Sequence, residues 1–316
     1  MAVLITGGMG FIGLHTARRF LDAGSRVVLT RFRAWRVPDF LAAEVGGDRL
    51  AVEPVDLADG WAMLDVVRRR GVRSIVHLAG PALGTEPAAE YSAALSGLVN
   101  VLETTRQQGL DRLSIASSVS VYDGAGTGPW REDQPLPVAS GSHIGAVKKA
   151  VEALALDFAG RTDVDVRILR LAAIYGPLYH SMANLPSRLC HAAVAGRAPD
   201  LTGVRGGPPH LEDAADLCYV KDCAAGIQLI HTSARLEHRQ YNIGAGRATS
   251  NAELVAAVRR VIPDARLEIQ PGAGGDAAPE PYMDIARAGN DAGYRPQHDV
   301  EAAVAEYISW LRAHPE

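Results

Sequence analysis

The chain has 316 residues, 47% of them hydrophobic, and a formal net charge of −4. This length and apolar content suit one large domain, or a larger domain with a smaller companion, and they exclude a disordered chain. The negative charge and scattered basic residues argue against a nucleic-acid partner. We find no apolar run of membrane-spanning length, no signal peptide before the first strand and no paired motif among the three cysteines. These features predict a soluble, cytoplasmic protein without membrane contact or disulfides.

The first stretch of the chain predicts a dinucleotide-binding turn. An apolar strand at residues 3–5 leads into three glycines spaced three apart, and a helix is expected over residues 11–23. The first glycine permits a tight turn, the second lets the backbone approach a phosphate, and the third lets the helix pack on the strand. The free N–H groups and the positive dipole end at the start of that helix attract an anion. The residues expected to hold a pyrophosphate are Gly7, Gly10, Phe11, Ile12 and Gly13.

The end of the second predicted strand, residues 26–30, bears on the choice of cofactor. A carboxylate at this point would bind the adenosine ribose hydroxyls of NAD, but Thr30 stands there, followed by Arg31 and Arg33. Two arginines suit a 2′-phosphate, which predicts NADP, with NAD as the alternative. Two solvent-exposed arginines on a loop are the other interpretation.

Strands and helices alternate along the rest of the chain. This order predicts an α/β fold with a Rossmann-type, doubly wound parallel sheet. Strands are expected at residues 50–55, 74–80, 113–118 and 165–169, and helices at 61–70, 90–108 and 143–158. A strand and helix follow within 214–232, and amphipathic helices at 251–262 and 300–313.

Several short segments, in order, resemble the extended short-chain dehydrogenase/reductase family, which contains the NAD-dependent epimerases and dehydratases. They are TGGMGFIG (6–13), DL (56–57), VHLA (76–79), ASS (116–118), VY (121–122), IYGP (174–177), YVKD (219–222) and YNIG (241–244). The resemblance covers nearly the whole chain. It implies a Rossmann domain formed by residues 1–176 and 214–245, with a smaller, C-terminal substrate-binding region formed by 177–213 and 246–316. It also implies a homodimer, made through the helices at 90–108 and 143–158.

The resemblance further implies roles for single residues around the cofactor. Asp56 would contact the adenine, and Ser118 would lie beside the nicotinamide and position a substrate carbonyl. The remaining residues implied to bind the cofactor are Leu57, Leu78, Ala79, Gly80 and Lys148.

The family normally moves a proton with a tyrosine four residues before a lysine, because this spacing places both on one helix face. Here Lys148 is present but Ile144 occupies the tyrosine position, and isoleucine cannot transfer a proton. Two other positions also depart from the family pattern. Ala94 replaces an asparagine, and Ala215 replaces an arginine that would hold the diphosphate of a nucleotide sugar.

The missing tyrosine leaves three interpretations open. In one, His143, Tyr179 or His180 moves the proton during hydride transfer at a carbonyl or alcohol carbon of a small substrate. In another, the substrate or a water held by Ser118 supplies the proton. In the third, the chain is a non-catalytic NADP-binding sensor or scaffold, and Lys148 merely pairs with Glu152.

The sequence also bears on the charge of the substrate and on whether a metal site is present. Losing the arginine at position 215 argues against a typical nucleotide-sugar substrate, although Arg188, Arg197 or Arg205 can supply charge from elsewhere. Histidines at positions 180, 191 and 210 lack ligand spacing, so no metal is expected.

Overall fold

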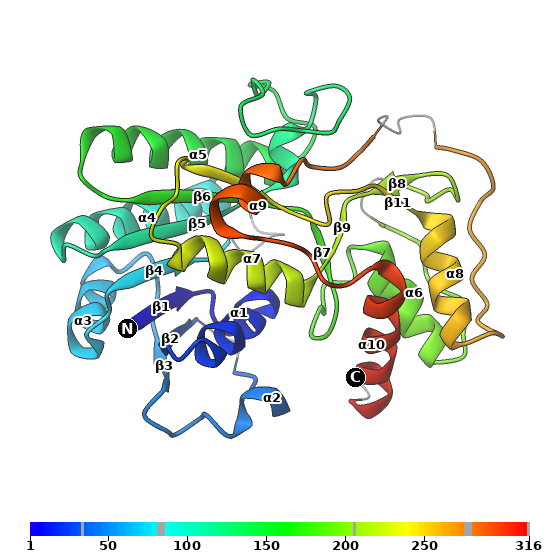
Figure 1. The fold of residues 1–316 in the computed structure, drawn as a ribbon, viewed down its shortest axis with the longest axis horizontal. Helices are drawn as coiled ribbons and strands as arrows, with labels where there is room; N and C mark the ends of the chain where they lie inside the picture. Colours follow the sequence, from blue (N-terminus) through cyan, green and yellow to red (C-terminus); the bar gives the residue numbers. More distant parts are fainter. Residues whose placement is uncertain (33–34, 81–85, 205–206, 275–279, 315–316) are drawn as a thin grey trace.

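The fold is built on a seven-stranded parallel sheet (Figure 1). The computed structural model describes residues 1–32, 35–80, 86–204, 207–274 and 280–314. The strand order is β10-β6-β5-β4-β1-β2-β3, and this confirms the predicted Rossmann-type sheet. The strands are β1 (Ala2–Thr6), β2 (Arg26–Arg31), β3 (Leu50–Pro54), β4 (Ser74–His77), β5 (Arg112–Ser118), β6 (Val166–Leu171) and β10 (Gln240–Ile243).

Helices cover both faces of this sheet. On one face α1 (Phe11–Asp22) contacts α7 (Val220–Thr232), and α9 (Ala286–Ala292) packs on α7 and β10. On the other face α4 (Pro87–Gln107) lies between α3 (Gly60–Arg70) and α5 (His143–Arg161).

The interior strand β1 shows why both faces of the sheet are covered. In β1, Val3 and Ile5 belong to one hydrophobic cluster and Leu4 to the other. Successive side chains of a strand point to opposite faces, so a strand that is apolar throughout needs a layer on each side.

A smaller group of elements lies beside the sheet, to its right in Figure 1. Here α10 (Val300–Ala313) packs on α8 (Asn251–Val261) and α6 (Leu185–Val194). The pairs β8 (Ala214–Ala215) with β11 (Thr249–Ser250), and β7 (Ala173–Tyr175) with β9 (Leu217–Tyr219), complete it. Two short elements are α2 (Asp39–Ala42) and the 3₁₀ helix η1 (Val119–Tyr122).

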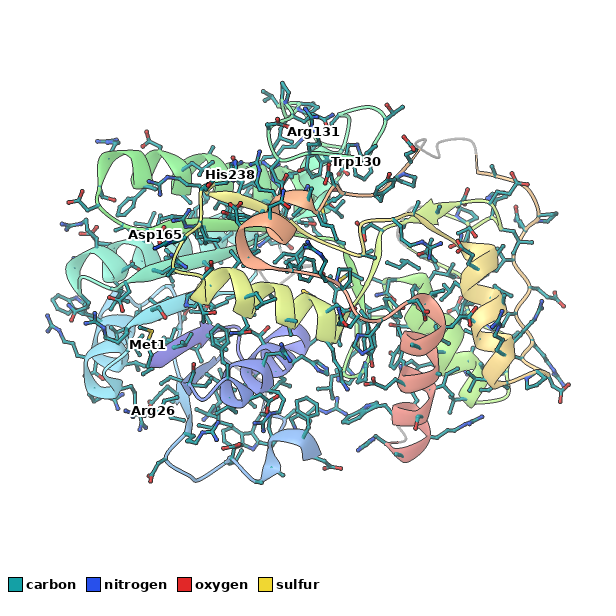
Figure 2. All side chains as sticks on the ribbon, in the orientation of Figure 1. Met1, Arg26, Trp130, Arg131, Asp165 and His238 are labelled. Carbon is teal, nitrogen blue, oxygen red and sulfur yellow. The ribbon has the colours of Figure 1, made fainter. Side chains whose placement is uncertain are left out.

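The direction of the strands determines where a ligand binds. Figure 2 shows Met1, Arg26 and Asp165 together at the amino end of the sheet, so the carboxyl ends face the smaller group of elements. The chain leaves β1 toward β2 on one side and reaches β4 on the other, which creates a switch point at the carboxyl end of β1. Ligands of open α/β sheets bind in the crevice at such a point.

Some elements differ from the sequence-based expectation. The strand expected at 74–80 ends at His77. The N–H of Leu78 donates to the Thr6 carbonyl, but the N–H of Ala79 donates to the Thr6 hydroxyl and not to a backbone carbonyl of β1. Helix α6 was not expected, although its N-terminal signals are present: Asn184 accepts a hydrogen bond from the Ser187 N–H, and Pro186 lies in the first turn. Among the described residues, no helix combines the length and apolar character required to cross a membrane.

Candidate active site

A cavity of about 810 Å³ lies at the carboxyl end of the sheet, facing the smaller group of elements. Its lining residues come from segments far apart in the sequence. On the sheet side they are Phe11, Ile12, Leu78, Gly80, Ala116, Ser117, Ser118, His143, Ile144, Val147, Lys148, Leu171, Ala172, Ala173, Ile174 and Tyr179. On the other side they are Asn184, Leu185, Pro186, Val204, Gly207, Pro208, Pro209, His210, Asp213, Ala214, Ala215, Leu217, Asn251 and Gly274.

The glycine-rich turn lies between β1 and α1, as the sequence indicates. Gly7 has φ 65°, which L side chains rarely adopt, and Gly10 is the residue before the first turn of α1. A Cβ on Gly13 would lie 2.5 Å from the Gly7 carbonyl oxygen, so only glycine lets α1 start this close to the turn. The first residues of α1, Phe11 and Ile12, line the cavity.

A buried histidine contacts Thr6, the residue just before the glycine-rich turn. His77 Nδ1 lies 2.7 Å from Thr6 Oγ1, which also accepts a hydrogen bond of 3.4 Å from the N–H of Ala79. Burial lowers the pKa of His77 to about 3, so its ring is neutral. Leu78 and Gly80, on either side of Ala79, line the cavity.

The end of β2 also contacts the glycine-rich turn. Thr30 Oγ1 accepts a hydrogen bond of 3.2 Å from the N–H of Gly7. The Arg31 guanidinium lies over the ring of Trp35, 5.5 Å from its centroid. Arg33 lies outside the described residues. Thr30 therefore lies at the end of β2, as expected. Of the two arginines that follow it, Arg31 stacks on the Trp35 ring.

Asp56 and Leu57 lie just after β3. One carboxylate oxygen of Asp56 accepts a hydrogen bond of 2.9 Å from the Ala58 N–H, which fixes the turn before α3. The Leu57 carbonyl accepts one of 2.8 Å from the Asn100 side chain on α4. Neither residue lines the cavity described above.

Ser118 and Lys148 lie together on the wall of the cavity. Ser118 ends β5, and its hydroxyl oxygen accepts a hydrogen bond of 3.2 Å from the Ser120 N–H. Lys148 Nζ donates one of 2.7 Å to the Ala116 carbonyl. Burial lowers the pKa of Lys148 to about 8. One helical turn before Lys148, Ile144 presents an apolar side chain to the same cavity.

Glu152 binds Arg170 rather than Lys148. Its carboxylate accepts hydrogen bonds of 3.0 and 2.7 Å from two nitrogens of the Arg170 guanidinium, and it also accepts one from the Ser117 hydroxyl. Both partners of this ion pair are almost fully buried. The pair ties α5 to β6, so it fixes the helix that carries Lys148.

His143 begins α5 and lies beside a buried carboxylate. Its Nε2 is 2.5 Å from Glu90 Oε2 on α4, and the Glu90 side chain is only 7% exposed. The ring of Tyr91 lies 5.3 Å from the imidazole, centroid to centroid. Glu90 was missed by the sequence analysis, because nothing in the local sequence links these two helix starts.

The other two candidates for proton transfer occupy different environments. Tyr179 lines the cavity, and its ring makes an edge contact with Phe11 at 5.1 Å between centroids. His180 does not line the cavity; its exposed imidazole lies against the guanidinium of Arg36.

The far side of the cavity contains polar residues that the sequence analysis did not select as functional. Asp213 accepts hydrogen bonds from the backbone N–H groups of Gly274 and His210, at 2.7 and 2.8 Å. His210 Nδ1 lies 3.6 Å from the same carboxylate. Within the part of the chain that the structure describes, no cluster of histidine, cysteine and acidic side chains is arranged to hold a metal ion.

Similarity to known proteins extends over most of the chain. Residues 3–244 match the sequence profile described as the NAD dependent epimerase/dehydratase family. The chain belongs to this family. It is an NAD-dependent epimerase/dehydratase of the short-chain dehydrogenase/reductase type, as the sequence motifs predicted, and NAD binding is part of that assignment.

Individual relatives include nucleotide-sugar epimerases. UDP-glucose 4-epimerase 2 from Oryza sativa subsp. japonica is 29% identical over 349 aligned positions, which cover 99% of this chain and 82% of the relative. The structure of a Thermotoga maritima UDP-glucose 4-epimerase with UDP-glucose gives a TM-score of 0.83 at 20% identity and covers both chains completely. The Bifidobacterium longum UDP-glucose 4-epimerase, solved with NAD+ and UDP, gives 0.81 at 22% identity, covering 100% of this chain and 99% of its own. These structures confirm the fold.

Proposed function

We propose that this enzyme transfers a hydride between a nicotinamide dinucleotide and a carbonyl or alcohol carbon of a small substrate. The observation that carries the proposal is the cavity at the switch point, where Ser118, Lys148 and His143 meet the glycine-rich turn. The residues present fit the dinucleotide: Gly7 and Gly10 give a turn with room for a pyrophosphate beside the N-terminus of α1. When bound, the nicotinamide supplies or accepts the hydride.

The chain's own residues then hold the substrate and move a proton. Ser118 donates a hydrogen bond from its hydroxyl to the substrate oxygen, while the Lys148 ammonium places a positive charge beside it. Charge developing on that oxygen is thereby stabilised. Because Ile144 has no ionisable group, the proton transfer falls to another lining residue.

His143 is the group that we assign to proton transfer. It follows Ser142 at the first position of α5 and lines the cavity, and Glu90 lies against its Nε2. A buried carboxylate beside one ring nitrogen fixes the orientation of the imidazole. Tyr179 also lines the cavity but contacts only the Phe11 ring among the interactions described, so it is the second candidate.

We also propose a preference for NADP over NAD. Thr30 carries no charge to repel a 2′-phosphate, and Arg31 follows it at the end of β2. Thermal unfolding tests this: NADP raises the melting temperature more than NAD at equal concentration, because stabilisation grows as RT ln(1 + [L]/Kd). Arg31→Ala removes the difference, whereas Arg26→Ala, at the opposite end of the same strand, retains it. A larger shift with NAD in the natural chain would overturn the preference.

The organisation of the whole chain is part of the proposal. Residues 1–176 and 214–245 bind the dinucleotide, and 177–213 and 246–316 bind the substrate. Exposed apolar side chains on α4 and α5, namely Tyr91, Val99 and Leu154, support a homodimer formed through these helices. The cysteines at positions 190, 218 and 223 are free and buried, which supports a reducing, cytoplasmic location.

The reaction is tested with the protein saturated with cofactor. A panel of small ketones and secondary alcohols is offered, and the absorbance of the reduced nicotinamide is followed. We expect turnover with at least one member, lost in Lys148→Met and Ser118→Ala. A cofactor-dependent thermal shift without turnover across the panel would overturn the reaction and leave only cofactor binding.

A further inference from the structure

The cavity differs in charge between its two sides. Lys148 is the only lysine or arginine among the described lining residues, and it lies on the sheet side. Across the cavity, the lining is mostly apolar and includes Val204, Pro208 and Pro209. The described far side therefore has a mostly apolar surface without lysine or arginine, and its one histidine is His210.

The far side does contain a carboxylate. Asp213 is held by hydrogen bonds from the N–H groups of His210 and Gly274, and its side chain is 26% exposed. Burial works to raise its pKa, but these hydrogen bonds outweigh it, and the pKa lies below its usual value. The carboxylate is therefore ionised at neutral pH and fixed in direction.

The His210 ring lies beside this carboxylate, with Nδ1 3.6 Å from it, and the two asparagines on this side are engaged with the backbone. Asn184 donates to the Ile174 carbonyl and accepts from the Ser187 N–H, and Asn251 donates to the His210 carbonyl. Arg188 on α6 does not line the cavity, because its guanidinium binds the carbonyls of Met182 and Asp200. Asp213 is thus the one acidic side chain among the described residues that line the cavity.

We propose that the substrate is an apolar alcohol or ketone that carries a protonated amine, with the ammonium group beside Asp213, and not a nucleoside diphosphate. This inference rests on the proposed function, because it assigns the substrate half of the same cavity. The ammonium group supplies a positive charge that pairs with the negative, fixed carboxylate of Asp213. A diphosphate requires fixed cationic partners and here meets a carboxylate and Ala215.

The test uses three matched probes on protein saturated with NADP. They are cyclohexanol, 4-aminocyclohexanol and 4-hydroxycyclohexanecarboxylate, which differ in one charge, and UDP is added as a fourth probe. We expect the amine to bind roughly 10- to 100-fold more tightly than the carboxylate, with the neutral alcohol between them, by titration calorimetry. UDP is expected not to bind at millimolar concentration.

A substitution then identifies the group responsible. In Asp213→Asn the amine and the neutral alcohol bind within about twofold of each other. Asp200→Asn, which alters an exposed carboxylate that does not line the cavity, keeps the preference. The comparison of probes on the natural chain needs no variant, so it decides the inference even if Asp213→Asn does not fold.

The outcomes separate this inference from the proposed function. Absence of a thermal shift with both NADP and NAD would remove the proposed function itself. A normal NADP shift together with UDP binding, or with an amine that binds no better than the carboxylate, would overturn only the substrate class.

Discussion

His143 and Glu90 form a close pair at the wall of the cavity, with His143 Nε2 only 2.5 Å from Glu90 Oε2. His143 is the first residue of α5 and Glu90 lies in the first turn of α4, and these helices are neighbours on the same face of the sheet. A buried carboxylate next to a cavity-lining imidazole is an arrangement that general acid–base catalysis uses.

Replacing either member of the pair should slow the reaction without weakening cofactor binding. We expect His143→Ala to lower kcat about 100-fold, and Glu90→Gln about 10-fold, because the second change only loosens the imidazole. KM and the NADP-dependent thermal shift should stay unchanged. Glu90→Asp should recover part of the loss, and Glu86→Gln, an exposed change one turn earlier, should have no effect. Equal kcat in His143→Ala and the natural chain would refute the assignment.

A phenol introduced at position 144 should replace the imidazole. In the double variant His143→Ala with Ile144→Tyr, the new hydroxyl lies four residues before Lys148, on the same helix face. We expect activity at least about tenfold above His143→Ala alone. The matched control is His143→Ala with Ile144→Phe, which adds the ring without the hydroxyl. If the phenylalanine variant recovers as much activity, the hydroxyl is not the reason.

Lys148 should reduce the stability of the protein without cofactor. Its folded pKa of about 8 lies below the value of 10.5 for the unfolded chain, so between these values the unfolded chain binds more protons and stability rises with pH. Lys148→Met removes the buried charge, and we expect the variant to be more stable than the natural chain by ~1–2 kcal/mol at pH 7.

Urea unfolding of both chains across pH measures this effect. The difference in unfolding free energy should shrink as the pH rises from 8 toward 10.5, because the natural chain then loses its buried charge. The variant should also lose most of its NADP-dependent thermal shift. A variant less stable than the natural chain at pH 7 would show that the Lys148 hydrogen bond to Ala116 outweighs the burial of its charge.

Breaking the Glu152–Arg170 pair should destabilise the fold strongly. Glu152→Gln leaves the Arg170 charge buried without its carboxylate, at a cost of about 3–5 kcal/mol in unfolding free energy. Asp157→Asn on the same helix breaks an exposed pair with Arg161 and should cost less than about 0.5 kcal/mol. Both are measured by urea unfolding. Similar losses in the two variants would contradict the importance of burial.

The sequence by itself determined the fold and the glycine-rich turn between β1 and α1. The signals there are local: a strand, three glycines and a helix follow one another within about a dozen residues, and the close approach at Gly13 involves only Gly7 and Gly8. Helix α10 was predicted with the bounds that the structure has, because its apolar stripe follows the helical period. Helix α6 was missed despite its capping signals, since short elements have weak patterns.

Only the tertiary structure decided which side chains share the cavity. It places Glu90 beside His143, and Asp213 on the side of the cavity opposite the sheet. It also pairs Glu152 with Arg170 and not with Lys148. It also leaves His180 outside the cavity wall, next to Tyr179, which is part of it. Such relationships join segments far apart in the chain. Their geometry is determined by how the helices pack on the sheet, which no local pattern of residues records.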